Sequence, residues 1–213
     1  MKNEELRITS TVSIENKNTS NLYISEVKGD VVKYINRRDS VYYLKKSLTK
    51  LGKVQHSAIM NISKTDPADL ATEIPSGFEF YESPRDGQVF FRKIPVYNIS
   101  DIEIAIVDAA MKTNEDVDSY ILERRANEIV VFVTNKPDIS YFPVYIRIDN
   151  IYKHCIYEDV MKFEKDKKTY IAQRFCYRSS FNDWIYLEES NDLKYLAEKY
   201  CDYIEKESFY ELF

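Results

Sequence analysis

The sequence predicts an α+β fold with a mainly antiparallel sheet, built from hairpins and about three to five helices. Three observations favour this class. Short β-rich segments occur in pairs around turn residues, helical segments are few, and the two kinds are interspersed along the 213 residues. The chain is also tyrosine-rich, with 18 Tyr and 11 Phe, so it has the apolar side chains that a packed core requires.

The start of the chain predicts a flexible lead-in followed by a hairpin. Residues 1–20 are polar and end in an Asn/Lys/Thr/Ser run. Two β-rich segments, 22–27 and 31–37, then flank the Lys-Gly-Asp sequence at 28–30. Glycine beside aspartate between two such segments is typical of a hairpin turn. We therefore expect two antiparallel strands here.

A helix is expected after this hairpin. Ser40 can cap a helix over residues 41–51, and Gly52 can end it because glycine adopts the left-handed conformation without a steric penalty. Pro67 then marks the first turn of a second, brief helix, where its missing N–H does no harm. Residues 21–75 are thus expected to form a basic β-β-α unit.

The clearest hairpin signal opens the second part of the chain. Segments 78–82 and 88–94 are rich in aromatic and β-branched residues, and Ser-Pro-Arg-Asp-Gly at 83–87 joins them. Proline early in the turn and glycine at its end match a type I turn that closes a hairpin. Two antiparallel strands are expected over these segments.

A capping box predicts the next helix. The Ser100 side chain can accept a hydrogen bond from the N–H of Glu103, whose carboxylate can reach back to the N–H of Ser100. The helix is expected over residues 101–111, with one apolar stripe packed against a sheet or another helix. The expected stripe consists of Ile102, Ala105, Ile106 and Ala109.

Residues 128–133 predict a strand that is covered on both faces, because they form an apolar run of β-branched and aromatic side chains. We expect it to be the central strand of the sheet. Residues 139–157 fit two structures, since their apolar residues suit a helix while positions 144, 146 and 148 alternate as in a strand. A helix is the preferred interpretation.

The rest of the chain predicts a hairpin and a helix. Segments 161–163 and 169–177 flank a charged stretch that suits a solvated hairpin tip. A helix is expected over residues 192–204, with its buried stripe at Leu193, Leu196, Ala197, Tyr200 and Ile204. Residues 76–213 are therefore expected to form an acidic α+β body, either separate from residues 21–75 or continuous with them in one domain.

Charge is unevenly distributed along the chain. The net charge is −5, but residues 1–75 hold 12 Lys/Arg against 9 Asp/Glu, while residues 76–213 hold 18 against 26. Residues 26–53 are the most basic and contain interleaved tyrosines. Basic side chains neutralise phosphates and tyrosines stack on unpaired bases, so this segment is a nucleic-acid candidate, with a solvated face as the alternative. The candidate residues are Lys28, Lys33, Arg37, Arg38, Lys45 and Lys46.

No metal site and no cofactor are expected. A zinc site needs converging ligands, but His154 and Cys155 have no second pair near them, and CxxC and HxxxH spacings are absent. Phosphate-binding, dinucleotide-binding and serine hydrolase motifs are also absent. A nuclease or thiol site that only the fold assembles, from residues such as Asp159, Glu164 and Cys176, stays open. The sequence leans towards a protein that is not an enzyme.

Aromatic residues near the C-terminus are the candidates for binding a protein partner. Tyr and Trp are favoured at interaction hot spots because they bring a large contact area at a low entropy cost. The alternative is that they pack in the core or dock on the body. The candidates are Trp184, Tyr186, Phe209, Tyr210 and Phe213.

The sequence predicts a cytoplasmic protein that does not enter a membrane. No stretch approaches the roughly 20 apolar residues that cross a bilayer, and the charged residues 1–7 lack the apolar run of a signal peptide. The three cysteines are odd in number and widely spaced, which suits reduced thiols better than disulfides.

Several segments resemble those of a family of uncharacterised bacterial proteins. The likeness rests on residues 75–82, 87–92 and 183–187, on positions 192, 193, 196, 197 and 200, and on residues 207–212, and it covers most of the chain. The resemblance implies no activity, cofactor or catalytic residue.

Three functions are consistent with these observations. The first is a non-enzymatic interaction protein, an adaptor or regulatory subunit of a bacterial system that binds a protein partner or self-associates. The second is nucleic-acid binding through residues 26–53. The third is an enzyme whose site forms only in the fold.

Overall fold

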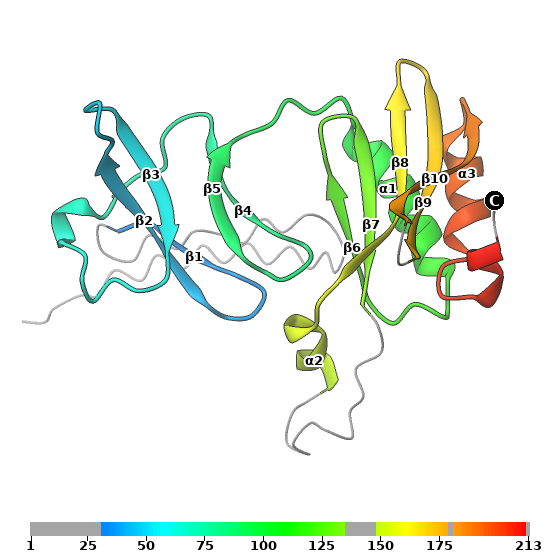
Figure 1. The fold of residues 1–213 in the computed structure, drawn as a ribbon, viewed down its shortest axis with the longest axis horizontal. Coiled ribbons are helices and arrows are strands. Elements are labelled where there is room, and N and C mark those ends of the chain that lie inside the picture. Colours follow the sequence, from blue (N-terminus) through cyan, green and yellow to red (C-terminus); the bar gives the residue numbers. More distant parts are fainter. Residues whose placement is uncertain (1–30, 135–147, 179–180, 212–213) are drawn as a thin grey trace, which may run out of the picture.

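A computed structural model describes residues 31–134, 148–178 and 181–211. Figure 1 shows two β-rich parts arranged along the long axis of the molecule. The first lobe, residues 31–98, contains a three-stranded sheet and a two-stranded hairpin, and the second lobe, from residue 99 onward, contains a five-stranded sheet with helices. Within the described residues every strand pair is antiparallel and three α-helices form, which confirms an α+β fold with mainly antiparallel sheets.

The first lobe is built around apolar side chains from all five of its strands. Its elements are β1 (Lys33–Ile35), β2 (Val41–Leu48), β3 (Val54–Ile59), the 3-10 helix η1 (Pro67–Asp69), β4 (Phe78–Glu82) and β5 (Val89–Lys93). The sheet order is β1-β2-β3, and β4 pairs with β5. Phe80 of the β4–β5 hairpin packs against apolar residues of both β1 and β2. This hairpin therefore shares its apolar contacts with the first sheet.

The helix predicted over residues 41–51 is wrong, because these residues form β2. Tyr42 and Leu44 are both buried and alternate with more exposed neighbours, which is the period-2 pattern of a half-buried strand. Ser40 does not cap a helix. Its N–H donates to the side chain of Asn36, which closes the turn between β1 and β2. Gly52, with φ +74°, lies in the turn between β2 and β3.

The other expectations for this lobe have mixed outcomes. The hairpin over 78–94 is confirmed, and Gly87 has a φ of +72°. The predicted type I turn is wrong, because the Gly87 N–H donates to the carbonyl oxygen of Ser83, four residues earlier, which makes the turn wider. The brief helix at Pro67 is confirmed as η1, which Asp66 caps. The segment 31–37 contains β1, while the expected strand at 22–27 lies outside the described residues.

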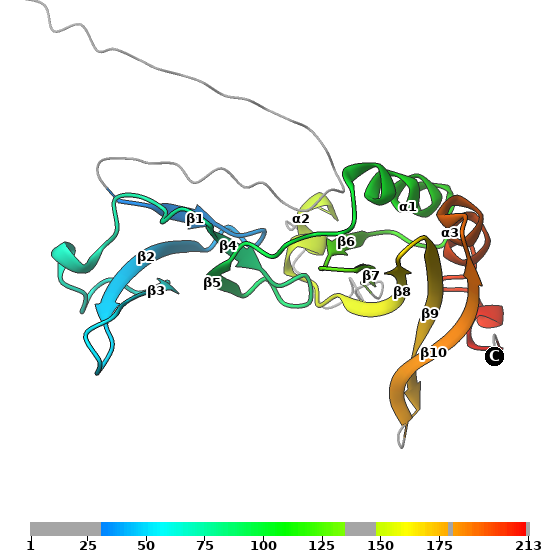
Figure 2. The same cartoon turned by 90° about the horizontal axis from the view of Figure 1, so that it is seen from above.

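The second lobe packs two helices on one face of its sheet. Its elements are α1 (Asp101–Thr113), β6 (Tyr120–Arg124), β7 (Glu128–Val133), α2 (Ile148–His154), β8 (Glu158–Asp166), β9 (Thr169–Arg178), β10 (Phe181–Ser190), α3 (Leu193–Cys201) and the 3-10 helix η3 (Glu207–Glu211). The sheet order is β10-β9-β8-β7-β6. Figure 2 shows α1 and α3 side by side on one side of the sheet. Between them and the sheet lies the main core of the protein.

Helix α1 begins with the predicted capping box at Ser100 and Glu103, but its packed stripe is not the expected one. Ile104, Val107 and Met111 are buried in the core, whereas Ile102 is 74% exposed. The stripe was assigned incorrectly because apolar residues surround this helix, so that helical periodicity fits two opposite faces equally well.

The remaining expectations for the second lobe are largely confirmed. Strand β7 is covered on both faces, although the middle strand of the sheet is β8. The hairpin with a charged tip is β8–β9. Helix α3 buries the predicted stripe from Leu193 to Tyr200, but it ends at Cys201, so the buried Ile204 lies beyond the helix that was expected to reach it. Of the ambiguous segment 139–157, residues 148–154 form α2, residues 139–147 lie outside the described part of the chain, and residues 155–157 lead into β8.

Candidate interaction surface

The residues proposed for nucleic-acid binding do not form one basic surface. Arg37 is buried, and Arg38 donates to the carbonyl groups of His154 and Cys155. Lys45 lies 4.0 Å from Asp69, and Lys33 lies over the ring of Tyr43. Lys46 is exposed on β2, and Lys28 lies outside the described residues. The tyrosines of this segment are largely used by the fold, because Tyr34 and Tyr42 are buried.

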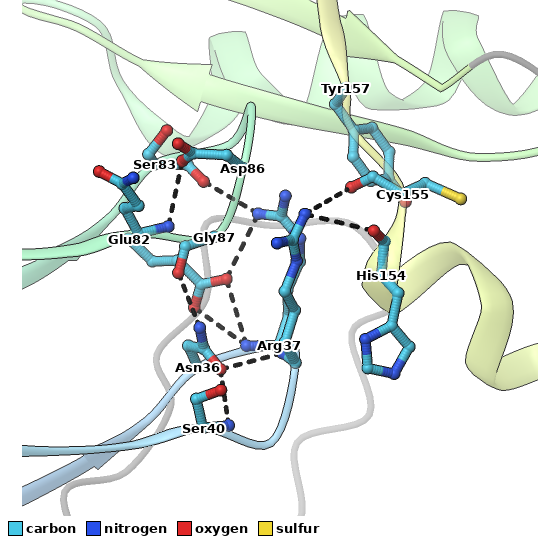
Figure 3. A network of polar contacts seen from close by, with 12 residues as sticks. Asn36, Arg37, Ser40, Glu82, Ser83, Asp86, Gly87, His154, Cys155 and Tyr157 are labelled. Carbon is cyan, nitrogen blue, oxygen red and sulfur yellow. Dashed lines mark hydrogen bonds and ion pairs between the residues drawn. The ribbon is translucent and has the colours of Figure 1, made fainter. Parts of the chain in front are cut away.

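Arg37 occupies the centre of a polar network that joins the two lobes. Its Nη1 lies 3.3 Å from Glu82 Oε1 and donates to Ser83 O at 2.9 Å, while its guanidinium lies over the ring of Tyr157. Figure 3 shows this side chain between the β4–β5 turn and Tyr157, which precedes β8. Arg37 Nε and Nη2 have no hydrogen-bond partner within the described part of the chain. The network therefore fixes the β1–β2 turn against the second lobe.

The buried pair of Arg37 and Glu82 is costly to desolvate. Burial raises the pKa of the Glu82 carboxyl, although Arg37 and Tyr34 donate hydrogen bonds to it. Burial also lowers the pKa of the Arg37 guanidinium, against the attraction of Glu82. Both directions show that loss of hydration outweighs the attraction between the two charges. The arrangement suits a structural junction.

A cleft of about 260 Å³ lies at this junction, between the β4–β5 hairpin and β6. Its polar groups bind one another. Tyr81 donates to Glu123 at 2.5 Å, and Arg92 lies 3.6 Å above the Tyr81 ring while it donates to Glu79 at 2.9 Å. Burial and the bond to Glu123 raise the pKa of Tyr81, so this hydroxyl stays protonated. Tyr81 is therefore no base for proton transfer near neutral pH, and the Glu82 carboxyl that also lines the cleft is held by Arg37 and Tyr34.

The residues named for metal or thiol chemistry do not converge. Asp159 pairs with Arg85 at 2.8 Å, and Glu164 lies five residues further along β8, roughly 16 Å away for an extended strand. Cys176 is buried and His154 is exposed at the end of α2. No group of three or more potential metal ligands occurs in residues 31–134, 148–178 and 181–211.

Among the residues that the structure describes, one group of strongly exposed apolar side chains was missed by the sequence interpretation. Leu48 and Val54 are cross-strand partners at the end of the β2–β3 hairpin, and Leu51 lies in the turn between them. Their side chains are 71%, 62% and 86% exposed, respectively. We call these three residues the hairpin tip. Figures 1 and 2 place it at the end of the molecule remote from α1 and α3.

The aromatic residues predicted to bind a partner are divided between core and surface. Trp184 is half-buried, with Phe175 in edge contact at 5.1 Å and Lys162 over its ring. Phe209 is buried in the main core, and Tyr186 is exposed on β10. Phe213 and the side chain of Tyr210 lie outside the described residues. Only Tyr186 among the described members of this group therefore offers a largely exposed ring.

Comparisons with family models, with curated proteins and with solved structures found no match for this chain. Among the residues that the structure describes, no helix has the length and apolar character needed to cross a membrane.

Proposed function

We propose that this protein is a non-enzymatic interaction protein, an adaptor or regulatory subunit of a bacterial system, and that the hairpin tip binds its protein partner. The observation that carries the proposal is the exposure of Leu48, Leu51 and Val54 at a single site. Single exposed apolar residues are ordinary, whereas an exposed cluster marks an interaction site. Full burial of such a side chain contributes about 1.5–3 kcal/mol, so covering what is exposed here contributes about 4 kcal/mol before the costs of association.

The charges around the hairpin tip define the partner. Residues 40–65 contain no Asp or Glu, and Lys50 and Lys53 lie in the same turn as Leu51. Complementary charge at the rim of an interface favours the right partner and speeds the encounter. The partner therefore presents an apolar groove bordered by carboxylates.

The experiment uses a tip variant and a matched control. The tip variant carries Leu48→Ser, Leu51→Ser and Val54→Ser, and the control carries Ile94→Ser, Val96→Ser and Ile156→Ser, which are also exposed apolar positions. A photo-crosslinking amino acid at Leu51 identifies the partner in the host, and calorimetry with that purified partner measures the Kd. We expect the tip variant to bind at least tenfold more weakly and the control to bind normally. Equal binding by both variants contradicts the proposal.

Nucleic-acid binding is the second candidate, because the acid-free stretch brings Lys46, Lys50 and Lys53 together on the β2–β3 hairpin. Such binding would rest on phosphate contacts, since Tyr34 and Tyr42 are buried and cannot stack on bases. A gel shift at low salt with single-stranded and duplex nucleic acid tests this candidate. A shift that disappears with added salt and in the variant Lys46→Glu/Lys50→Glu/Lys53→Glu supports it, and the absence of any shift excludes it.

A further inference from the structure

Three buried side-chain nitrogen atoms in the described part of the chain lack a hydrogen-bond partner, and all three belong to adjacent arginines. They are Nε and Nη2 of Arg37 and Nε of Arg38. A buried donor without a partner is destabilising, and the penalty is larger when the group is charged. The turn between β1 and β2 therefore holds donors that the protein itself leaves unused.

The unused donors of Arg37 form a fork. In a guanidinium group, the N–H bonds of Nε and Nη2 lie in one plane and point in the same direction. This edge matches the two oxygens of a carboxylate, which it binds through two parallel hydrogen bonds. The remaining nitrogen, Nη1, is the one that donates to Glu82 and Ser83 (Figure 3). One edge of the side chain thus holds the junction, while the other edge is available for an anion.

The charges around the fork favour an anion over water. Glu82 balances the charge of Arg37, whereas Arg38 donates to two uncharged backbone carbonyl groups. Asp86 attracts both guanidinium groups from further away. Burial lowers the pKa of the Arg37 guanidinium, and the like charge of Arg38 lowers it further. A carboxylate at the fork would satisfy two donors and offset the repulsion between the two arginines.

Arg37 also lines the cleft of about 260 Å³ between the β4–β5 hairpin and β6. Two other carboxylates of the lining already have cationic partners, since Glu79 pairs with Arg92 and Glu123 pairs with Arg125. Much of the remaining wall is apolar, and it includes Phe80, Pro84, Ile121 and Leu122. Pockets for drug-sized molecules have roughly 300–1,000 Å³. The cleft therefore suits a smaller molecule whose body is apolar.

We propose that this cleft binds a small molecule with one carboxylate and an apolar or aromatic body, and that the carboxylate binds the Nε and Nη2 edge of Arg37. The body lies between β4 of the first lobe and β6 of the second. Because the ligand contacts both lobes, it stabilises their arrangement. The hairpin tip lies at the far end of the first lobe, so this site is separate from the proposed partner site.

Titration calorimetry of the full chain tests the chemistry of the ligand. The probes are benzoate, phenylacetate and hexanoate, and the controls are phenylacetamide, which has no charge, and acetate, which has no apolar body. We expect phenylacetate to bind with a Kd of about 1 mM, which is reasonable for about ten non-hydrogen atoms. Both controls should bind at least tenfold more weakly.

Three results of this titration overturn the proposal. Equal binding of acetate and phenylacetate would show that the fork holds an adventitious anion only. Equal binding of phenylacetamide and phenylacetate would show that the charge has no role. Absence of binding by all three carboxylate probes at about 20 mM, well above the expected Kd, would show that the cleft is not a carboxylate site.

A variant tests the role of the fork. Arg37→Lys keeps a positive charge beside Glu82 but has no fork, and Arg85→Lys is the same change in the exposed turn, where Arg85 pairs with Asp159. We expect the Kd for phenylacetate to rise at least tenfold in Arg37→Lys and to stay unchanged in Arg85→Lys. The hairpin-tip variant should also bind phenylacetate normally, even if it no longer binds a protein partner. An unchanged Kd in Arg37→Lys overturns the proposal.

A measurement on the wild type needs no variant, so it holds even if Arg37→Lys fails to fold. At about 10 mM phenylacetate, roughly ten times the expected Kd, mass action should raise Tm by about 3–6 °C. The same concentration of phenylacetamide should leave Tm unchanged. An equal rise with both compounds, or no rise with either, contradicts a carboxylate site.

Discussion

The ion pair of Arg37 and Glu82, both in the first lobe, provides the sharpest test of how the side of that lobe that faces Tyr157 is held together. Their side chains are 6% and 3% exposed, and the Glu82 carboxylate accepts bonds from Tyr34 Oη, from the Arg37 backbone N–H and from Arg37 Nη1 at 3.1–3.3 Å. Arg37→Ala leaves this carboxylate buried without its counter-charge. Removing one partner of such a pair costs about 3–5 kcal/mol. For a chain of this size, that loss lowers Tm by roughly 6–20 °C.

The double variant Arg37→Met/Glu82→Leu separates the cost of an orphaned charge from the value of the pair. Because burial dominates the pKa directions of both groups, replacing both charges with apolar side chains should cost less than either single substitution. The coupling energy, measured by a double-mutant cycle, should be at least about 2 kcal/mol. Additive single effects would show that the two charges do not depend on each other, and the reasoning would fail.

The same variants carry a pH signature. The pKa of Glu82 is already raised in the folded state, so its contribution to stability is complete below its unfolded pKa and is lost as pH rises through the folded pKa. Arg37→Ala raises that pKa further, because the counter-charge is gone. Its destabilisation should therefore be smaller near about pH 5 than near about pH 8. Urea unfolding followed by far-UV circular dichroism covers both lobes, while fluorescence of Trp184 reports on the second lobe alone.

Three further predictions concern the second lobe. Hydrogen bonds from Lys165, Tyr170 and Ser100 outweigh burial and lower the pKa of Glu103 to about 2. Glu103 therefore stabilises the folded state above its unfolded pKa of about 4.3, and this contribution is lost as pH falls towards about 2. In urea unfolding at a series of pH values, the free energy of unfolding of Glu103→Gln should fall less steeply below about pH 4 than that of the wild type. Val107→Ala, in the core, should lower the free energy of unfolding by about 1–3 kcal/mol in chemical unfolding. Ile102→Ala should lower it by less than about 0.5 kcal/mol. Equal losses would contradict the observed burial of α1. Asn114 donates to the carbonyl groups of Cys201, at the end of α3, and of Ile204 beyond it, so Asn114→Ala should cost about 2 kcal/mol in thermal unfolding. A change within about 0.5 kcal/mol would show that water replaces the Asn114 side chain.

Local signals predicted several elements because their physical causes are local. The capping box at Ser100, the proline of η1 and the turn before Gly87 each satisfy backbone groups within a few residues, so the sequence alone identifies them. The stripe of α3 was also predictable, because its apolar residues lie on one face only.

The misassignments have a different origin. Residues 41–51 carry a plausible cap and a terminal glycine, but pairing of Tyr42 and its neighbours with β1 and β3 outweighed those signals. The same error concealed the hairpin tip, because a helix would have placed Leu48, Leu51 and Val54 differently. The Thr-Lys-Leu-Gly sequence at 49–52 was the available turn signal.

The sequence by itself determined the α+β class, the hairpins at 78–94 and 161–177, and the starts of α1 and α3, since these depend on contacts between near neighbours along the chain. Only the tertiary structure decided which of two apolar faces of α1 is buried and that Arg37 is inside a junction rather than on a basic surface. It also decided that three aliphatic side chains are exposed together at the end of one hairpin. Each of these depends on which distant segment packs against a residue, and periodicity and composition do not contain that information.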